Sequence, residues 1–424
     1  MKKTLNHTVI PWFLLVISLV LGYFCASATE FTWSLTIALS VIFVLTVLYR
    51  NNFGKAPVAI ARTLLGAVFV FSGFVKGVDP LGTQYQIFDY FAAYNVLWAN
   101  PFAKMMAIGL ITAEMIVGIA LILNIRIPFT VWITALMMVF FTVTTLLDAT
   151  IYSDKISDCG CFGKAVKLTN WQTFYKNIVL DIWVVILFFG RYRIRNTFSL
   201  KNEFIITAFA TILFFGFQIY NLRHLPVIEF LDWKAGVKLN PPKTLPVTII
   251  FQYKNNATQE IHEFEVTNLP ADLSANWTFV GRIDHDPNPP NLMIPIYESR
   301  GNDAFDVADF IAGHPGYTFI VAIHDLGKTK NRNMDKILDL LDFADRNEHE
   351  FMFLFDLNVT DDSIEKFKQR AGRRDFNIYF SDDKSIKAIV RSNPGLILLQ
   401  DGYVRKKWAW RDIPSPERMR KIIK

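Results

Sequence analysis

Two cysteines, Cys159 and Cys161, lie one residue apart in the segment SDCGCFG, residues 157–163. Two thiols at this spacing can close only a very small ring, whose geometry departs from that of a relaxed disulfide. A strained, accessible disulfide is more oxidising and more easily reduced than a structural one, and Gly160 gives the backbone the freedom to close such a ring. This spacing favours a pair that cycles between dithiol and disulfide. A static disulfide that only braces the loop is the alternative, and a metal site is weak because the loop has no histidine.

Four ionisable residues lie within or beside apolar runs. Glu114 is inside ITAEMIVGIAL, Asp181 is near the middle of the run 171–189, and Arg62 and Lys76 bracket RTLLGAVFVFSGFVKG. Charges in such positions are costly and suggest either pairing or function. The structural interpretation pairs Glu114 with Arg62 or with neighbouring hydroxyl groups. The functional interpretation gives these residues a role in proton transfer or at a quinone.

Composition points to a membrane protein. Of the 424 residues, 52% are hydrophobic and 19% charged, whereas soluble chains carry about 25% charged residues. The long apolar runs all precede residue 223, and three cysteines cannot form a secreted disulfide framework. The net charge of +6 comes with basic residues clustered at the ends of apolar runs, which is typical of membrane topology. We therefore expect contact with membrane lipid and no nucleic-acid partner.

Segments of about 20 mostly apolar residues can cross a bilayer. The sequence holds seven, at about residues 9–25, 31–49, 58–75, 102–123, 127–147, 171–189 and 204–222. Alternation from a cytoplasmic start puts the densest cationic flanks on one side, which the positive-inside rule makes cytoplasmic. The cysteine loop and everything after residue 222 then face the periplasm of a bacterial inner membrane, an oxidising compartment. The alternative for the first segment is a signal peptide cleaved after Ala26-Ser27-Ala28.

Three blocks of sequence resemble a known family. The blocks RTLLGAVFVFSGFVKGVDPLGT, Glu114 followed by Gly118, and SDCGCFGKAVKLTNWQTFYKN are similar to the DoxX/MauE-like membrane protein family of Bacteroidetes. The resemblance covers about residues 57–222, and residues 1–56 add two further transmembrane helices. It implies a small helical bundle in the inner membrane and a link to periplasmic thiol–disulfide chemistry. By residue, that redox role carries over only to Cys159 and Cys161.

The polar remainder divides into two parts. Residues 223–315 contain short alternating runs bounded by prolines, which predict a small β-rich connector that acts as a spacer. Residues 316–424 alternate strands with helices and resemble a thioredoxin fold, with Pro394 at the place of that family's cis-proline. The position of the CxxC motif holds HDLGK instead, residues 324–328, and no cysteine follows Cys161. This domain is therefore predicted to bind partners rather than exchange disulfides, with His324 and Asp325 in a solvated loop.

Taken together, the sequence predicts a membrane α-helical bundle of about seven transmembrane helices, followed by a periplasmic α/β thioredoxin-like domain. The leading hypothesis is a thiol–disulfide oxidoreductase that uses Cys159 and Cys161 to exchange electrons with periplasmic protein thiols. A quinone held near Glu114 would then take the electrons. Two alternatives remain open. One is a non-enzymatic membrane scaffold whose outer domain binds envelope proteins, and the other is a transporter with Glu114 as its proton site.

Overall fold

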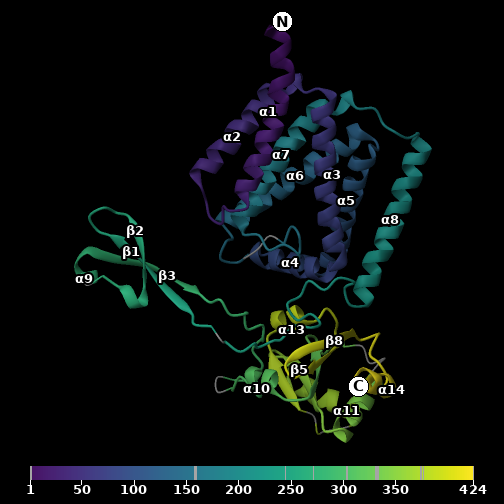
Figure 1. Ribbon diagram of the computed structural model, residues 1–424. Coiled ribbons are helices and arrows are strands. Elements are labelled where there is room, and N and C mark those ends of the chain that lie inside the picture. The colour runs from purple at the N-terminus through teal and green to yellow at the C-terminus, as the bar shows by residue number, and fades with distance from the viewer. Residues whose placement is uncertain are drawn as a thin grey trace. The chain divides into compact units, whose positions relative to one another are not determined.

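The computed structural model describes residues 2–156, 160–243, 245–270, 272–301, 304–329, 334–372, 375 and 377–423 (Figure 1). The chain divides into two compact units, Met1–Phe230 and Leu231–Lys424. The first unit is helical and the second contains all the strands of the described residues. Apolar helices followed by a sheet-rich region are the architecture that the sequence predicts.

The first unit is built from long helices joined by short turns. In chain order they are α1 (Lys2–Cys25), α2 (Trp33–Leu48), α3 (Lys55–Val78), α4 (Pro80–Ala93), α5 (Ala103–Leu123), α6 (Ile127–Thr150), α7 (Asn170–Gly190) and α8 (Leu200–Arg223). Within the described residues, five helical segments are long and apolar enough to cross a membrane: Lys55–Val78, Leu97–Leu123, Ile127–Thr150, Asn170–Arg193 and Leu200–Arg223. The two leading segments of the predicted seven form shorter apolar helices, Val9–Cys25 and Trp33–Leu48.

Helices α3 and α5 pack closely because glycines line their contact. A Cβ atom added to Gly118 would lie 2.6 Å from the backbone nitrogen of Val70, and one on Gly73 would lie 2.8 Å from that of Met115. Small residues let helix backbones approach in this way. The close approach fixes the axial position of one helix relative to the other. It thereby also fixes which of their polar side chains lie opposite each other.

The two leading helices pack against α7. The indole nitrogen of Trp183 donates a hydrogen bond to the buried hydroxyl of Ser18 at 2.9 Å. The hydroxyl of Tyr175, also buried, accepts a hydrogen bond from the backbone nitrogen of Thr32 at 2.9 Å. Helices α1 and α2 are therefore part of the bundle.

Helix α4 is not expected from hydropathy, since its sequence PLGTQYQIFDYFAA mixes polar and aromatic residues. Its start is well defined: the side chain of Asp79 accepts a hydrogen bond from the backbone nitrogen of Gly82, and Pro80 occupies the first turn. A capping acid and an early proline are strong helix-start signals. This helix places Gln86 beside Gly160 of the cysteine loop and Tyr90 beside Asp148 of α6.

The second unit holds two sheets. The strands β1 (Thr248–Asn255), β2 (Ile261–Glu265) and β3 (Trp277–His285) form an antiparallel sheet of order β2-β1-β3. The larger sheet has the order β6-β5-β4-β7-β8 and contains β4 (Tyr317–Ile323), β5 (Glu350–Asp356), β6 (Ile378–Ser381), β7 (Gly395–Gln400) and β8 (Tyr403–Ala409). Strands β4, β5 and β6 run parallel to one another, and β7 and β8 are antiparallel to their neighbours.

Helices α11 (Met334–Arg346), α12 (Asp361–Ala371) and α13 (Asp383–Ile389) connect successive strands of the larger sheet from β4 to β7. Helix α10 (Ala308–Gly313) precedes β4 and α14 (Pro416–Ile422) follows β8, whereas α9 (Leu273–Asn276) precedes β3 of the smaller sheet. The apolar faces of α11 and α12 pack on buried strand residues such as Phe353 and Phe355. Thr360 and Asp382 cap α12 and α13 through their side chains. The peptide bond between Asn393 and Pro394, just before β7, is cis.

Candidate functional site

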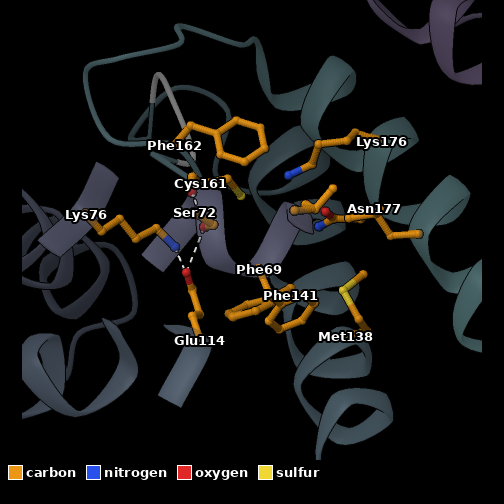
Figure 2. Close-up of a pocket in the computed structure, with 12 residues that line it drawn as sticks. Phe69, Ser72, Lys76, Glu114, Met138, Phe141, Cys161, Phe162, Lys176 and Asn177 are labelled. Atoms are coloured by element: carbon orange, nitrogen blue, oxygen red, sulfur yellow. Dashed lines mark hydrogen bonds and ion pairs between the residues drawn. The ribbon is translucent and has the colours of Figure 1, made fainter. Parts of the chain in front are cut away.

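The site begins with two residues one helical turn apart on α3. Ser72 and Lys76 share a face of that helix because their spacing is four residues, and Glu114 on α5 lies opposite them (Figure 2). Lys76 Nζ lies 2.6 Å from Glu114 Oε1, and the hydroxyl of Ser72 donates to Glu114 Oε2 at 2.7 Å. Both carboxylate oxygens of Glu114 therefore have partners.

The Lys76–Glu114 pair is deeply buried. The side chain of Lys76 is 8% exposed and that of Glu114 is 2% exposed. A buried charge is tolerated when an opposite charge and hydrogen bonds compensate it. Here one ammonium and one hydroxyl do so, which makes the pair a fixed polar centre inside the bundle.

Pairing of Glu114 with Arg62 is wrong. Ten residues separate Arg62 from Ser72, or about 15 Å along a helix, so Arg62 lies near the other end of α3. Its guanidinium instead donates to the carbonyl oxygens of Leu121 and Ile122, at the C-terminal end of α5. Cations at this end of a helix satisfy carbonyls that lack partners within the helix.

The backbone of the cysteine loop rests on the same serine. Ser72 also lies 2.8 Å from the carbonyl oxygen of Cys161, to which it can donate. A hydroxyl has one hydrogen, so Ser72 divides it between the Glu114 carboxylate and the loop carbonyl. Cys161 itself is partly exposed. Cys159 lies outside the described residues, so its pairing with Cys161 stays a prediction.

Two glycines shape the loop around Cys161. Gly160 and Gly163 have φ angles of +56° and +54°, a region that favours glycine. The backbone nitrogen of Gly163 donates to the carbonyl oxygen of Gly160 at 2.9 Å, which closes a turn. A Cβ atom on Gly160 would lie only 2.1 Å from the side-chain oxygen of Gln86 on α4. The loop is thus seated against both α3 and α4.

A small cavity separates Cys161 from the ion pair. Its lining includes Lys76, Glu114 and Ser72 together with Cys161, Phe162, Lys176, Asn177, Phe69, Val68, Met138, Phe141 and Leu180 (Figure 2). Its volume is about 30 Å³, enough for a water molecule, whereas an apolar cavity of about 150 Å³ is needed to bind benzene. The cavity that the described residues form at Glu114 is too small for a quinone ring.

Cations outnumber anions around this cavity. Lys176 and Lys76 line it together with one acid, Glu114. Figure 2 shows the ammonium group of Lys176 and the sulfur of Cys161 both pointing into the cavity. The ammonium of Lys176 also lies 4.5 Å from the centre of the Phe162 ring. Neighbouring cations stabilise the thiolate, which is the reactive form of cysteine.

Asp181 is not part of this site. Its carboxylate accepts a hydrogen bond from the hydroxyl of Thr142 at 2.7 Å, between α6 and α7, and it does not line the cavity. Of the four ionisable residues singled out from the sequence, the structure brings together only Lys76 and Glu114. Arg62 and Asp181 have separate local partners.

Sequence analysis does not identify three polar residues of the bundle. Ser72 and Lys176 look like an ordinary helix hydroxyl and a flanking cation. Asp148 lies one residue beyond the predicted end of the fifth apolar run, yet it is fully buried at 0% exposure and accepts a hydrogen bond from the hydroxyl of Tyr90 at 2.7 Å. A carboxylate at the end of an apolar run was the one signal that could have identified Asp148.

In the second unit, the HDLGK segment is only partly the solvated loop expected: Gly327 and Lys328 are exposed, but His324 is largely covered. The side chain of His324 is 17% exposed and lies 3.7 Å from the carboxylate of Asp383. Burial, together with the nearby charge of Lys387, lowers the pKa of His324 to about 4, so the ring is neutral at pH 7. Asp383 is the first residue of α13, and the start of this helix lies next to the end of β4.

The segment is also attached to the residue before Pro394. The side chain of Asn393 donates to the carbonyl oxygen of Asp325 at 2.6 Å and accepts from its backbone nitrogen at 3.4 Å. The carboxylate of Asp325 accepts from the backbone nitrogen of Lys328 at 3.0 Å. The two loops at this edge of the sheet are therefore joined. Within the described residues, no group of three or more histidines, cysteines or acids could hold a metal ion.

Comparison with known proteins gives one family. Residues 54–190 match the family model of the methylamine utilisation protein MauE, a range that runs from the start of α3 to the end of α7. No curated protein and no solved structure matches the chain. The MauE match and the apolar helices together indicate a multi-pass membrane protein with a membrane-associated accessory role.

Proposed function

We propose that this protein exchanges thiols and disulfides with envelope proteins through Cys159 and Cys161, from the periplasmic side of a bacterial inner membrane. The observation that carries the proposal is the setting of Cys161. It lies on a cavity with Lys76 and Lys176, and its carbonyl contacts the hydroxyl of Ser72. Cations beside a partly exposed cysteine are the environment in which thiolates form.

In the exchange, the thiolate of Cys159 attacks one sulfur of a partner's disulfide and displaces the other sulfur as a thiolate. Cys161 then attacks the mixed disulfide, which forms the Cys159–Cys161 bond and releases the second partner thiolate. The two protons of the cysteines end on the partner's two thiols. Run in reverse, the same steps oxidise a partner dithiol. Which cysteine attacks first is assigned on the expectation that Cys159 is the more exposed.

Electrons need not pass through a quinone at Glu114. The cavity there has room for water only, at about 30 Å³. We therefore propose that protein thiols both supply and remove electrons at the loop. The Lys76–Glu114 pair then serves to hold the loop and its charge environment.

We propose that the second unit is a thioredoxin-like module that binds a partner. Support comes from β4 and β5, which are parallel, joined through α11, and followed on the other side by the antiparallel hairpin β7-β8. This unit has no cysteine, and Asn393 bonds the segment where a CxxC motif would stand. Presentation of a substrate to the loop of the first unit is the role that remains.

Cysteine trapping tests the proposal. Cys161→Ser should accumulate a mixed disulfide through Cys159 in intact membranes, detected as a reducible adduct on gels. Cys25→Ser is the matched control: it removes a cysteine buried in α1 but keeps both loop cysteines, so the mixed disulfide should resolve and no adduct should accumulate. If Cys159→Ser and Cys161→Ser both form no adduct and both support normal envelope function, the exchange role is excluded.

The second candidate is a non-enzymatic scaffold, favoured by the bonded, cysteine-free loop at residues 324–328. It predicts that envelope function survives both serine variants but is lost when residues 231–424 are removed. The trapping experiment and this deletion therefore separate the two candidates.

A further inference from the structure

An open groove runs along α5 in the first unit. Its volume is about 780 Å³, within the range of about 300–1,000 Å³ that is typical of small-molecule sites. Most of its wall consists of apolar side chains of α5, such as Ile108 and Ile116, and Phe215 of α8 also lines it. Among the described residues, this groove shares no lining residue with the cavity at Glu114. It is therefore a separate feature of the bundle.

The packing of α8 on α5 leaves this groove unfilled. Helix α8, at the edge of the helical unit in Figure 1, meets α5 through Phe214, which clusters with Ile111. It also meets α5 through Gln218, whose side-chain nitrogen donates to the hydroxyl of Thr112 at 2.8 Å. The face of α5 that lines the groove carries Gly109, where an added Cβ would meet nothing within 4 Å. The protein thus leaves space beside Gly109 for another molecule.

The length of the groove matches one leaflet of a bilayer. From Lys104 to Ile116, both in its lining, a helix rises about 18 Å, and half of a hydrocarbon core of about 30 Å is about 15 Å. Trp98 and Phe102, in the 3-10 helix Leu97–Phe102 before α5, are exposed, and aromatic residues gather at the membrane–water interface. Lys104 is therefore expected at the level of the lipid headgroups, with the rest of the groove in the hydrocarbon.

The charge of the groove is positive and lies at one end. Lys104 is exposed, and within the described residues no acid lines the groove with it. The polar side chain deeper in the groove, Thr112, is used by the protein itself. Its hydroxyl donates to the carbonyl oxygen of Ile108 at 2.7 Å and accepts from Gln218. A cation at the headgroup level of an apolar groove favours an anionic lipid.

From these observations we propose that the groove binds one acyl chain of an anionic phospholipid, whose phosphate pairs with Lys104. The chain fills the space beside Gly109 and contacts Ile108 and Phe215. A quinone fits less well, because its ring oxygens need hydrogen-bond donors and the hydroxyl hydrogen of Thr112 is already donated. The proposal does not depend on thiol–disulfide exchange.

Photocrosslinking in bilayers tests the site. The full-length protein is reconstituted in phosphatidylcholine with a trace of phosphatidylglycerol that carries a diazirine in the middle of one acyl chain. Peptide mass spectrometry then locates the lipid adducts, which should concentrate on residues 108–116 of α5 and on Phe215. The same diazirine chain on phosphatidylcholine should give about fivefold less adduct there, the scale expected for one cation at an anionic surface.

Two variants with matched controls separate the acyl chain from the headgroup. Gly109→Leu fills the groove and should remove most of the adduct, whereas Gly216→Leu, at an equally open glycine of α8 outside the lining, should not. Lys104→Gln should make the adduct yields of the two lipids equal. Lys201→Gln should leave them unequal, since Lys201 is likewise exposed and likewise the second residue of its helix. Melting temperatures in detergent show that each variant is folded.

Several results would overturn the proposal. Adducts as frequent on exposed apolar residues of α6, such as Leu136 and Phe140, would mean that the groove holds bulk lipid alone. Equal yields from the two lipids in the parent protein would exclude an anionic headgroup. Displacement of the adduct by an equal membrane concentration of a long-chain quinone would give the groove to the quinone. Complete absence of lipid adducts from the groove, as when a helix of a second chain covers it, would exclude a lipid site.

Discussion

Lys76 is closely held inside the bundle. Its ammonium lies 2.6 Å from Glu114 and 5.7 Å from the centre of the Phe141 ring, with little solvent access. In hydrocarbon or a protein interior, an isolated charge costs far more than a pair. At the residue scale, the site depends on this compensation.

Replacement of Lys76 alone should therefore be severe. Lys76→Met leaves the Glu114 carboxylate buried with one hydroxyl partner, and we expect a loss of about 3 kcal/mol or more in the free energy of unfolding. Thermal unfolding in detergent measures the change. Adding Glu114→Gln to Lys76→Met should recover part of the lost stability. Lys201→Met, at an exposed position, is the control and should leave the stability unchanged. A double variant that is no more stable than Lys76→Met would argue against a compensating pair.

His324 makes the stability of the second unit depend on pH. Burial holds its pKa at about 4, below the ordinary value of 6.5, so the unfolded chain binds the proton more tightly between these values. Stability is then complete above about pH 6.5 and falls as the pH approaches 4, by about 3 kcal/mol in total. Urea unfolding of the protein and of His324→Gln at pH 7 and near pH 4 tests this. The variant should lose less stability on acidification than the parent.

At the element scale, backbone contact between α3 and α5 decides which side chains meet. The glycines at 66, 73 and 118 lie in this contact, and the polar residues at 72, 76 and 114 lie along it. A shift of one helix by a turn would separate Lys76 from Glu114 by about 5.4 Å. The glycines are therefore as necessary to the site as the charged residues.

Gly118→Ala tests this packing. Its new methyl group would lie 2.6 Å from the backbone nitrogen of Val70, and crowding of this kind costs about 1–3 kcal/mol. Gly109→Ala is the matched control on the same helix, because nothing lies within 4 Å of its added Cβ. We expect Gly118→Ala to lower the melting temperature and Gly109→Ala to leave it unchanged. Equal melting temperatures would show that α3 and α5 can separate without cost.

The cysteine loop offers a second matched pair. Gly160→Ala and Gly163→Ala share the positive φ, but a Cβ at Gly160 meets Gln86 at 2.1 Å, whereas one at Gly163 meets nothing closer than Val75 at 3.7 Å. Backbone strain of about 1 kcal/mol is common to both. Only Gly160→Ala should lift the loop from α4 and speed the alkylation of Cys161. The same rate in both variants would mean that contact with α4 does not control access to the thiol.

At the scale of the whole molecule, the order of spans sets the sides of the membrane. Two long apolar helices, α7 and α8, lie between the cysteine loop and the second unit. An even number of crossings returns the chain to the same side, whatever the first two shorter helices do. The loop and the second unit are therefore expected to face one compartment.

Membrane-impermeant maleimide tests this topology in spheroplasts. Cys161, after mild reduction, and a cysteine placed at the exposed Arg418 by Arg418→Cys in a Cys159→Ser, Cys161→Ser background should both be labelled from outside. Cys25, buried in α1, should resist labelling in both cases. Labelling of the two sites from opposite sides would mean that α7 or α8 does not cross the membrane. Labelling of both only after lysis would reverse the orientation.

The sequence by itself determined the apolar helices of the first unit, the strands and helices of the second, and the glycine-bearing cysteine loop. These features follow from local patterns: the length of apolar runs, alternation of apolar and polar residues, and turn-forming residues. The helix starting at Pro80 escaped this reasoning because its residues are neither uniformly apolar nor strongly periodic.

Tertiary structure decided which of these residues meet. Arg62 and Lys76 look equally suited to Glu114 in the sequence, but the height at which α3 packs on α5 selects Lys76. The burial of His324 likewise depends on where α13 returns to the sheet, and the contact of Ser72 with the carbonyl oxygen of Cys161 depends on how the loop folds back after α6. Such contacts depend on the rotation and axial position of each element, which packing between distant segments fixes and local patterns do not.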